Sequence, residues 1–244
     1  MSKKADTPEP PKLPEKRDES LGDYEAMENA PDLAMTIETL LKSPGRVLYE
    51  WQEGRGGLVG RHLAMIATVA FLLFGLILGL FSGGTQLWAA PVKVFAGILI
   101  SALIALPSLY VFSCLGGIDM TTRKAAGLLL LGLALVGVVL LGLCPVAWIF
   151  SQSTQAIGFM GFLVLLFWIT SLSFGLLLIF RSARKFGTDR GGYLVLWAII
   201  FVTVTLQMST SLRPIIGPAE ETLLPQEKRF FLGHWVEVMG ARAD

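Results

Sequence analysis

The chain has 244 residues, of which 53% are apolar and 16% are charged, and this charge content is too low for an ordinary soluble domain of its length. The net charge of +1 conceals a segregation, because residues 1–61 carry nine Lys/Arg and twelve Asp/Glu, whereas residues 62–212 carry seven and two. The chain therefore lacks a bulk positive field that would recruit nucleic acid, and its charge is lowest where a bilayer would require it.

The N-terminal part divides into two regions. Residues 1–31 are rich in Lys, Glu, Asp and Pro, a composition typical of a disordered segment, here expected to be cytoplasmic. Residues 32–61 form an amphipathic or interfacial region, because apolar residues recur at helical spacing before a Ser-Pro-Gly-Arg break at 43–46. After the break, Tyr49 and Trp51 are residue types that favour the headgroup layer. The helix before the break either lies on the inner leaflet or docks a partner, or it folds back onto the protein's own cytoplasmic loops.

Residues 62–212 predict an all-α integral membrane domain of five transmembrane helices. A run of about 20 apolar residues crosses the hydrocarbon core, and five such runs occur, at 63–81, 94–115, 125–150, 158–180 and 193–212. Residues 82–91 are expected to form a turn with an interfacial Trp88, with Pro91 in the first turn of the next helix. Pro107 should kink the second span unless neighbours satisfy the freed carbonyl. The turn between the third and fourth spans is placed at 151–155.

Glycines recur in two of the spans. The sequence GLILG at 75–79 has the small-xxx-small spacing that lets membrane helices approach closely. Gly132, Gly137 and Gly142 recur every five residues, so they should drift around their helix instead of forming one stripe. Both patterns indicate packing, and the spacing leaves open whether the contacts lie within one chain or between chains.

The positive-inside rule orients the spans. Nine Lys/Arg lie near span ends on one side, in the segments before the first span, between the second and third, and between the fourth and fifth. The predicted topology is therefore N-in and C-out, in the cytoplasmic (inner) membrane. The tail at 213–244 is then extracytoplasmic and contains a predicted interfacial helix with Trp235 as an anchor.

Four polar residues are candidates for a site. Gln207 and Ser211 are four residues apart at the end of the fifth span, and Arg213 follows them. They form either a polar partner or substrate site near the outer surface, or an interhelical hydrogen bond with an arginine anchoring the helix end. Asp119 is the fourth candidate, and local pairing with Arg123 or capping of the third span explains it more simply than acid–base chemistry does.

The chain contains no recognised catalytic or cofactor-binding motif. The two histidines lack metal-ligand spacing, and the two cysteines lie in apolar stretches, so no metal, cofactor or disulfide framework is predicted. The absence of intramembrane acids, and of an obvious internal repeat, also lowers the expectation of a secondary transporter.

Three phrases of the sequence resemble bacterial members of the Yip (Ypt-interacting protein) family of membrane proteins. They are LLKSPGRVLYEW at 40–51, WAAPVKVFAGILISALIALPSLYVFSCLGG at 88–117 and LQMSTSLRPIIG at 206–217. The resemblance implies a polar cytoplasmic N-terminal region, five helices, an outward C-terminus and no enzymatic activity. Eukaryotic members of that family look like scaffolds that bind small GTPases or shape membranes. The acidic tail of this chain departs from the pattern, which puts inherited partners in doubt.

The sequence as a whole favours a non-enzymatic membrane scaffold or accessory subunit. Its expected partners are membrane lipids and other membrane proteins or further copies of itself, and not nucleic acid. The alternative is a permease or channel component whose polar site lies at the outer end of the fifth span.

Overall fold

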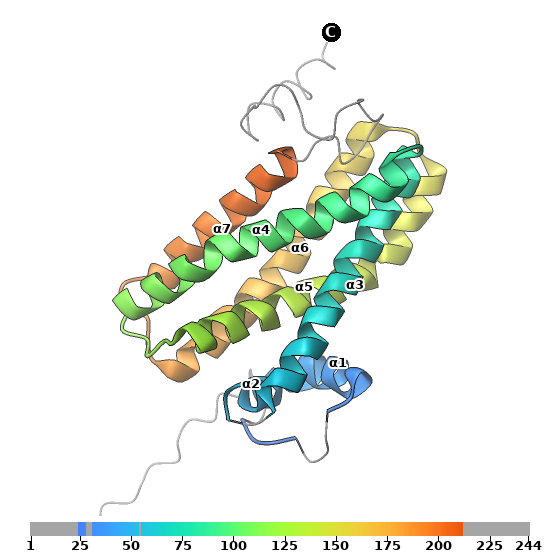
Figure 1. The fold of residues 1–244 in the computed structure, drawn as a ribbon. Helices are drawn as coiled ribbons and strands as arrows, with labels where there is room; N and C mark the ends of the chain where they lie inside the picture. The colour runs from blue at the N-terminus through green and yellow to red at the C-terminus, as the bar shows by residue number, and fades with distance from the viewer. Residues whose placement is uncertain (1–23, 28–30, 54, 212–244) are drawn as a thin grey trace, which may run out of the picture.

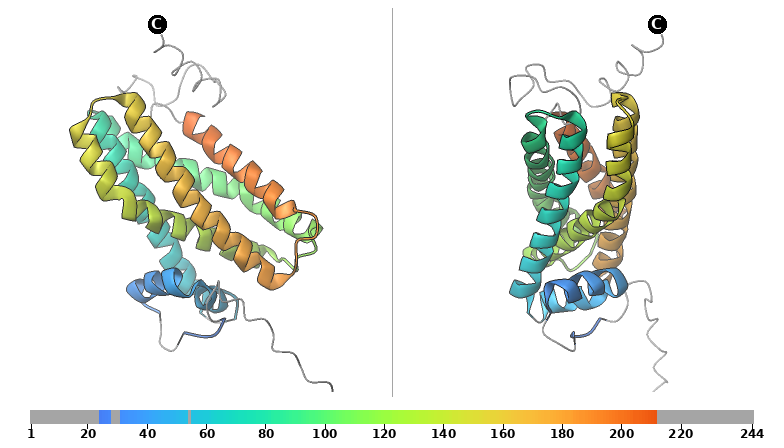
Figure 2. Two further views of the ribbon diagram at one scale, coloured as in Figure 1. Left: turned by 180° about the vertical axis from the view of Figure 1, so that it is seen from behind. Right: turned by 90° about the vertical axis from the view of Figure 1, so that its right-hand side faces the viewer.

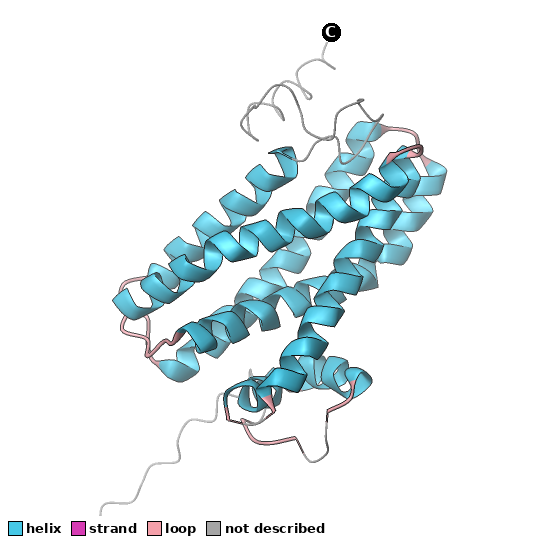
Figure 3. Ribbon diagram, in the orientation of Figure 1, coloured by secondary structure: helices cyan, strands magenta, loops and turns pink. Residues whose placement is uncertain are grey.

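The structure is a computed structural model that describes residues 24–27, 31–53 and 55–211, with side chains to residue 208. Within this part of the chain every regular element is a helix and strands are absent (Figure 3). The predictions for residues 1–23 and for the tail at 213–244, including Trp235, lie outside the described residues.

Two short helices precede the bundle where one was predicted. Helix α1 spans Leu33–Lys42 and begins at Asp32, whose Oδ1 accepts a hydrogen bond from the Met35 amide at 2.6 Å. The chain breaks at Ser43 as expected, but Pro44 then occupies the first turn of a second helix, α2, at Pro44–Gln52. The segment with Tyr49 and Trp51 is therefore helical.

The helix α1 folds back onto the bundle. Leu40 is 1% exposed and joins a buried cluster with Val47, Val59 and Leu63, whereas Leu41 is 54% exposed. Figure 2 shows α1 lying crosswise at the end of the bundle, beside the start of α3. The sequence leaves open whether this helix lies on the membrane or on a partner, or folds back onto the protein's own loops. Its buried face supports the folded-back arrangement. The surface on which it packs belongs to the helices of the bundle.

Among the described residues, four helices are long and apolar enough to cross a membrane, and a fifth apolar helix is shorter. Their bounds are α3 Gly56–Ser82, α4 Gln86–Leu115, α5 Thr122–Ser153, α6 Ile157–Ala183 and α7 Tyr193–Ser211, with a 3-10 turn, η1, at Arg184–Phe186. Each of the five overlaps one of the predicted apolar runs, but the turn between α5 and α6 lies at 154–156 and not at 151–155, because α5 continues through Ser153.

The start of α4 differs from its prediction. The turn after α3 contains only residues 83–85, and Trp88 and Pro91 both lie inside α4. Pro91 is thus the sixth residue of the helix and not part of its first turn. The extra turn of helix is held against α3 by backbone contact, which the sequence of this segment alone does not reveal.

The helices pack in the spatial order α7, α4, α3, α5, α6. The helix α3 is central because it contacts both α4 and α5, while α6 lies on α5 and α7 lies on α4 (Figure 1). Trp168 of α6 reaches across to stack on Phe71 of α3 at 6.0 Å between ring centroids. On the other side, the buried Trp197 of α7 donates a hydrogen bond from Nε1 to the carbonyl oxygen of Ala105 in α4 at 3.0 Å.

The glycines of the GLILG segment make a close contact within the chain. A Cβ atom at Gly75 would lie 2.5 Å from Pro91 Cα, and one at Gly79 would lie 2.6 Å from the carbonyl oxygen of Gln86. Both obstacles are backbone atoms of α4. The two glycines therefore allow α3 and α4 to pack at a distance that no side chain would permit.

Three of the four glycines of α5, Gly132, Gly137 and Gly142, face different surroundings, as their five-residue spacing predicts. Gly132 packs on Ile179 and Gly175 of α6, whereas Gly137 packs on Ala70 of α3. A Cβ at Gly142 would meet nothing within 4 Å. Two of the three glycines thus allow α5 to contact α6 and α3, and the third is open to substitution.

Candidate functional site: the polar end of the bundle

The three cationic segments of the chain lie at one end of the bundle, called here the polar end. Figure 1 shows α1, α2, the loop between α4 and α5 and the loop between α6 and α7 at this end, whereas α7 ends at the opposite one. Hydrogen bonds and ring contacts link these segments to one another. The polar end therefore gathers most of the charged side chains of the described residues.

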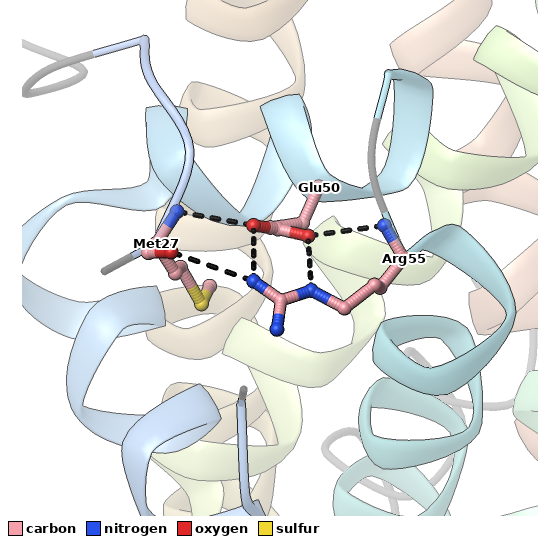
Figure 4. A network of polar contacts seen from close by, with 3 residues as sticks. All are labelled: Met27, Glu50 and Arg55. Carbon is pink, nitrogen blue, oxygen red and sulfur yellow. Dashed lines mark hydrogen bonds and ion pairs between the residues drawn. The ribbon is translucent and has the colours of Figure 1, made fainter. Parts of the chain in front are cut away.

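The buried carboxylate of Glu50 is the centre of a small network on α2 (Figure 4). One carboxylate oxygen accepts hydrogen bonds from the Met27 amide at 3.0 Å and from the Arg55 guanidinium at 3.2 Å. The other accepts from the Arg55 amide at 3.0 Å and from Arg55 Nε at 3.3 Å. Arg55 also donates to the carbonyl oxygen of Met27. The network ties the chain before α1 and the start of α3 to α2.

The network makes the polar end sensitive to acid. Burial alone would raise the pKa of Glu50, but hydrogen bonds from Arg55 and Met27 and the charge of Arg55 outweigh it and hold the pKa below its ordinary value of 4.5. A carboxyl whose pKa is lower in the folded state contributes stability above its unfolded pKa, and this contribution is lost as the pH falls through the folded pKa.

We therefore expect the α1–α2 segment to loosen below about pH 4.5. The measurement is protease cleavage of the purified protein between α1 and α3 as a function of pH. In Glu50→Gln the same cleavage is expected already at neutral pH, whereas the exposed Glu38→Gln should behave as the wild type. A Glu50→Gln profile identical to the wild type would contradict this role for the carboxylate.

Trp51 fastens α2 to the bundle through three glycines. Its ring fills the space that a Cβ atom would need at Gly60 of α3 and at Gly127 of α5, and its carbonyl oxygen lies where a Cβ at Gly56 would be. Trp51 Nε1 donates to the carbonyl oxygen of Arg123 at 2.9 Å, and Arg123 Nη2 donates back to the carbonyl oxygen of Trp51 at 2.9 Å. This arrangement, called here the tryptophan clasp, joins residues 72 positions apart.

Comparison of the chain with family models, with curated proteins and with solved structures found no match. The resemblance to the Yip family stays a prediction.

Two loops of the polar end are joined to each other. The Asp119 amide donates to the carbonyl oxygen of Phe186 at 2.9 Å, and the Arg190 amide donates to that of Gly116 at 3.1 Å. The carboxylate of Asp189 accepts from the amides of Tyr193 and Leu194 at 3.1 and 2.9 Å, which satisfies free donors at the start of α7. The sequence signal for this last role was an acid just before a span, and it was overlooked.

Two of the predicted site residues, Asp119 and Gln207, lie at opposite ends of the bundle. Asp119 lies in the α4–α5 loop at the polar end, where its exposed carboxylate pairs with Lys124 at 2.9 Å and not with Arg123; Thr121 caps α5. Gln207 is half-buried near the end of α7, at the opposite end of the bundle. Ser211 is the last residue of α7, but its side chain and all of Arg213 lie outside what the structure describes. The proposed polar cluster at the end of α7 stays a prediction.

The remaining aromatic anchors differ in exposure. Trp88 is 78% exposed on α4, as an interfacial residue would be. Tyr49 is half-buried and meets the Tyr24 ring edge-on, with 5.3 Å between the centroids. Whether these rings lie at headgroup level stays a prediction, but the Trp51 ring is held by the protein itself.

The described part of the bundle contains a narrow apolar crevice. The crevice between α5, α6 and α7 is lined wholly by apolar residues and glycine and has no interior room for a water-sized sphere. No group of three His, Cys, Asp or Glu side chains within the described ranges could hold a metal. What the polar end can do, from its contacts, is fix helices and loops in place and present charge to a surface.

Proposed function

We propose that the protein is a non-enzymatic multi-pass membrane scaffold or accessory subunit that acts through protein or lipid contacts. The observation that supports this proposal is the use of the polar groups: at the polar end the Glu50 network, the tryptophan clasp and the loop–loop hydrogen bonds use many of them to fasten one element to another. Such groups build a rigid surface and leave little to act on a substrate.

The membrane placement belongs to the same proposal. The five apolar helices span the cytoplasmic (inner) membrane, with the polar end and the N-terminus in the cytoplasm and the end of α7 outside. Support comes from the grouping of the cationic segments at one end, because the positive-inside rule requires them to share a side.

Orientation has a direct test. A reporter inserted at Thr188, between η1 and α7, is expected to be cytoplasmic, and a reporter fused after Asp244 is expected to be extracytoplasmic. Reporters active on the same side of the membrane would contradict an odd number of spans.

The scaffold function predicts protein neighbours at defined positions. A photo-crosslinking amino acid at Leu41, which is exposed on α1, should give discrete adducts with other membrane or cytoplasmic proteins in native membranes. The matched position is Leu40, which is 1% exposed and should crosslink only within the chain. Two results together would instead support a permease or channel component. The first is that Leu41 forms no adducts, and the second is that Gln207→Ala is expressed normally but loses solute flux.

A further inference from the structure

The cations of the polar end outnumber its carboxylates, and most of the excess lies in one segment. Within the described residues this end carries ten Lys/Arg and seven Asp/Glu. Arg61, Arg181, Arg184 and Arg190 are the arginines whose side chains have neither a hydrogen bond nor an ion pair there. Three of these four arginines belong to residues 181–190, called here the basic segment.

The basic segment contains no carboxylate that forms an ion pair with its cations. Its one acid is Asp189, and both oxygens of that side chain accept backbone hydrogen bonds from the start of α7. Its fourth cation, Lys185, lies 5.8 Å from the centroid of the Tyr24 ring, which does not neutralise it. The segment therefore presents positive charge that the surrounding protein does not balance.

The basic segment is also held in place. Its backbone is hydrogen-bonded to the α4–α5 loop at Phe186 and at Arg190, and the Phe186 ring lies under the Lys124 ammonium at 4.7 Å. A charged segment that is fixed before it binds loses less conformational entropy on binding than a free one does. These contacts preorganise the segment for a ligand.

Exposed aliphatic side chains lie beside these cations. Leu177 precedes Arg181 by four residues and so shares its face of α6. Leu115, at the end of α4, adjoins Gly116, the residue whose carbonyl oxygen accepts from the Arg190 amide. Val195 follows Arg190 at the start of α7 and is exposed as well. Arg181 and Arg190 thus each lie within five residues of an exposed aliphatic side chain, and this meeting of charge and apolar surface is called here the border.

We propose that the basic segment binds the headgroups of anionic phospholipids in the leaflet facing the polar end. A phospholipid matches both parts of this border, because its phosphate faces the arginines and its acyl chains cover the exposed leucine and valine side chains. An acidic protein would satisfy the charges and leave the apolar side chains uncovered, so the border favours a lipid. The proposal rests on the membrane placement given under Proposed function, and it names the partner of that surface.

The test is lipid binding to the purified full-length protein in micelles, counted by native mass spectrometry. The wild type should bind dioleoylphosphatidylglycerol in preference to dioleoylphosphatidylcholine, which has the same chains and no net charge. Each cation near an anionic surface is worth about fivefold in binding. The variant R181Q/R184Q/R190Q should therefore lose roughly tenfold or more of this preference.

The matched control is K3Q/K4Q/K12Q, which removes the same charge from another part of the chain and should keep the preference. Should the triple arginine variant fail to fold, the single exposed variant Arg184→Gln is expected to lose about fivefold. An equal loss in both triple variants would show a bulk charge effect and overturn the proposal.

Two competition measurements identify the ligand. Displacement of the bound lipid by millimolar inorganic phosphate would indicate a general anion site, and equally tight binding of a polyglutamate peptide would indicate an acidic protein; either result overturns the lipid assignment. The orientation reporters and the Leu41 crosslink do not depend on these measurements, so a failure here is distinguishable from a failure of the proposed function.

Discussion

Replacing Gly75 by alanine is expected to lower the free energy of unfolding by about 2–3 kcal/mol, which is the upper part of the range for overpacking a tightly packed site. The new methyl group would lie 2.5 Å from Pro91 Cα, and a backbone atom cannot rotate out of the way. The helices α3 and α4 must therefore separate along their length or bend. The measurement is SDS-induced unfolding of the purified protein, followed by circular dichroism.

The control for Gly75 is Gly142→Ala in α5, where the new methyl meets nothing within 4 Å. This variant should be neutral or slightly stabilising, because alanine is the better helix former. If Gly75→Ala and Gly142→Ala were equally stable, the close approach of α3 and α4 would be refuted.

The tryptophan clasp predicts a strong coupling between Trp51 and Gly127. Alone, Gly127→Ala should cost about 1–3 kcal/mol, because the methyl would overlap the indole ring. Alone, Trp51→Ala should cost about 2–4 kcal/mol, since the ring is half-buried and its hydrogen bond to Arg123 is lost. In the Trp51→Ala background, the alanine at position 127 should cost almost nothing.

This double-mutant cycle isolates the contact from the general effect of each substitution. Gly57→Ala, also at the start of α3, supplies the matched control because its methyl would meet nothing within 4 Å. Additive costs for Trp51→Ala and Gly127→Ala would mean that the ring and the glycine do not meet.

The apolar helices could be predicted because a bilayer would impose a length and a composition on each of them. The apolar runs and the break at Ser43 are local signals, and the structure confirms helices at these places; the turn expected at 151–155 lies at 154–156. The drifting glycines of α5 were also predictable, since the spacing fixes their directions around one helix. These properties depend on neighbours a few residues apart along the chain.

The clasp and the start of α4 could not be predicted in the same way. Tyr49 and Trp51 were interpreted as headgroup residues from their type alone, but the position of the Trp51 ring depends on a glycine 76 residues later. Pro91 is expected in the first turn of α4 from its type, but the additional turn before it packs by its backbone on Gly79 and Gly75 of α3. The partner of Asp119 was misjudged by one residue, because Arg123 is engaged with α2.

The order of packing in the bundle bears on how the protein is made. A helix leaving the ribosome can pack only on helices already synthesised. Here α4 and α5 both pack on α3, α6 packs on α5, and α7 packs on α4. Each of these helices therefore packs on one that precedes it in the chain. Each apolar helix can therefore pack as soon as it is synthesised, and none has to wait for a later helix as its first packing partner. The last of these steps brings Trp197 to the Ala105 carbonyl, and the fluorescence of that buried indole would report that assembly is complete.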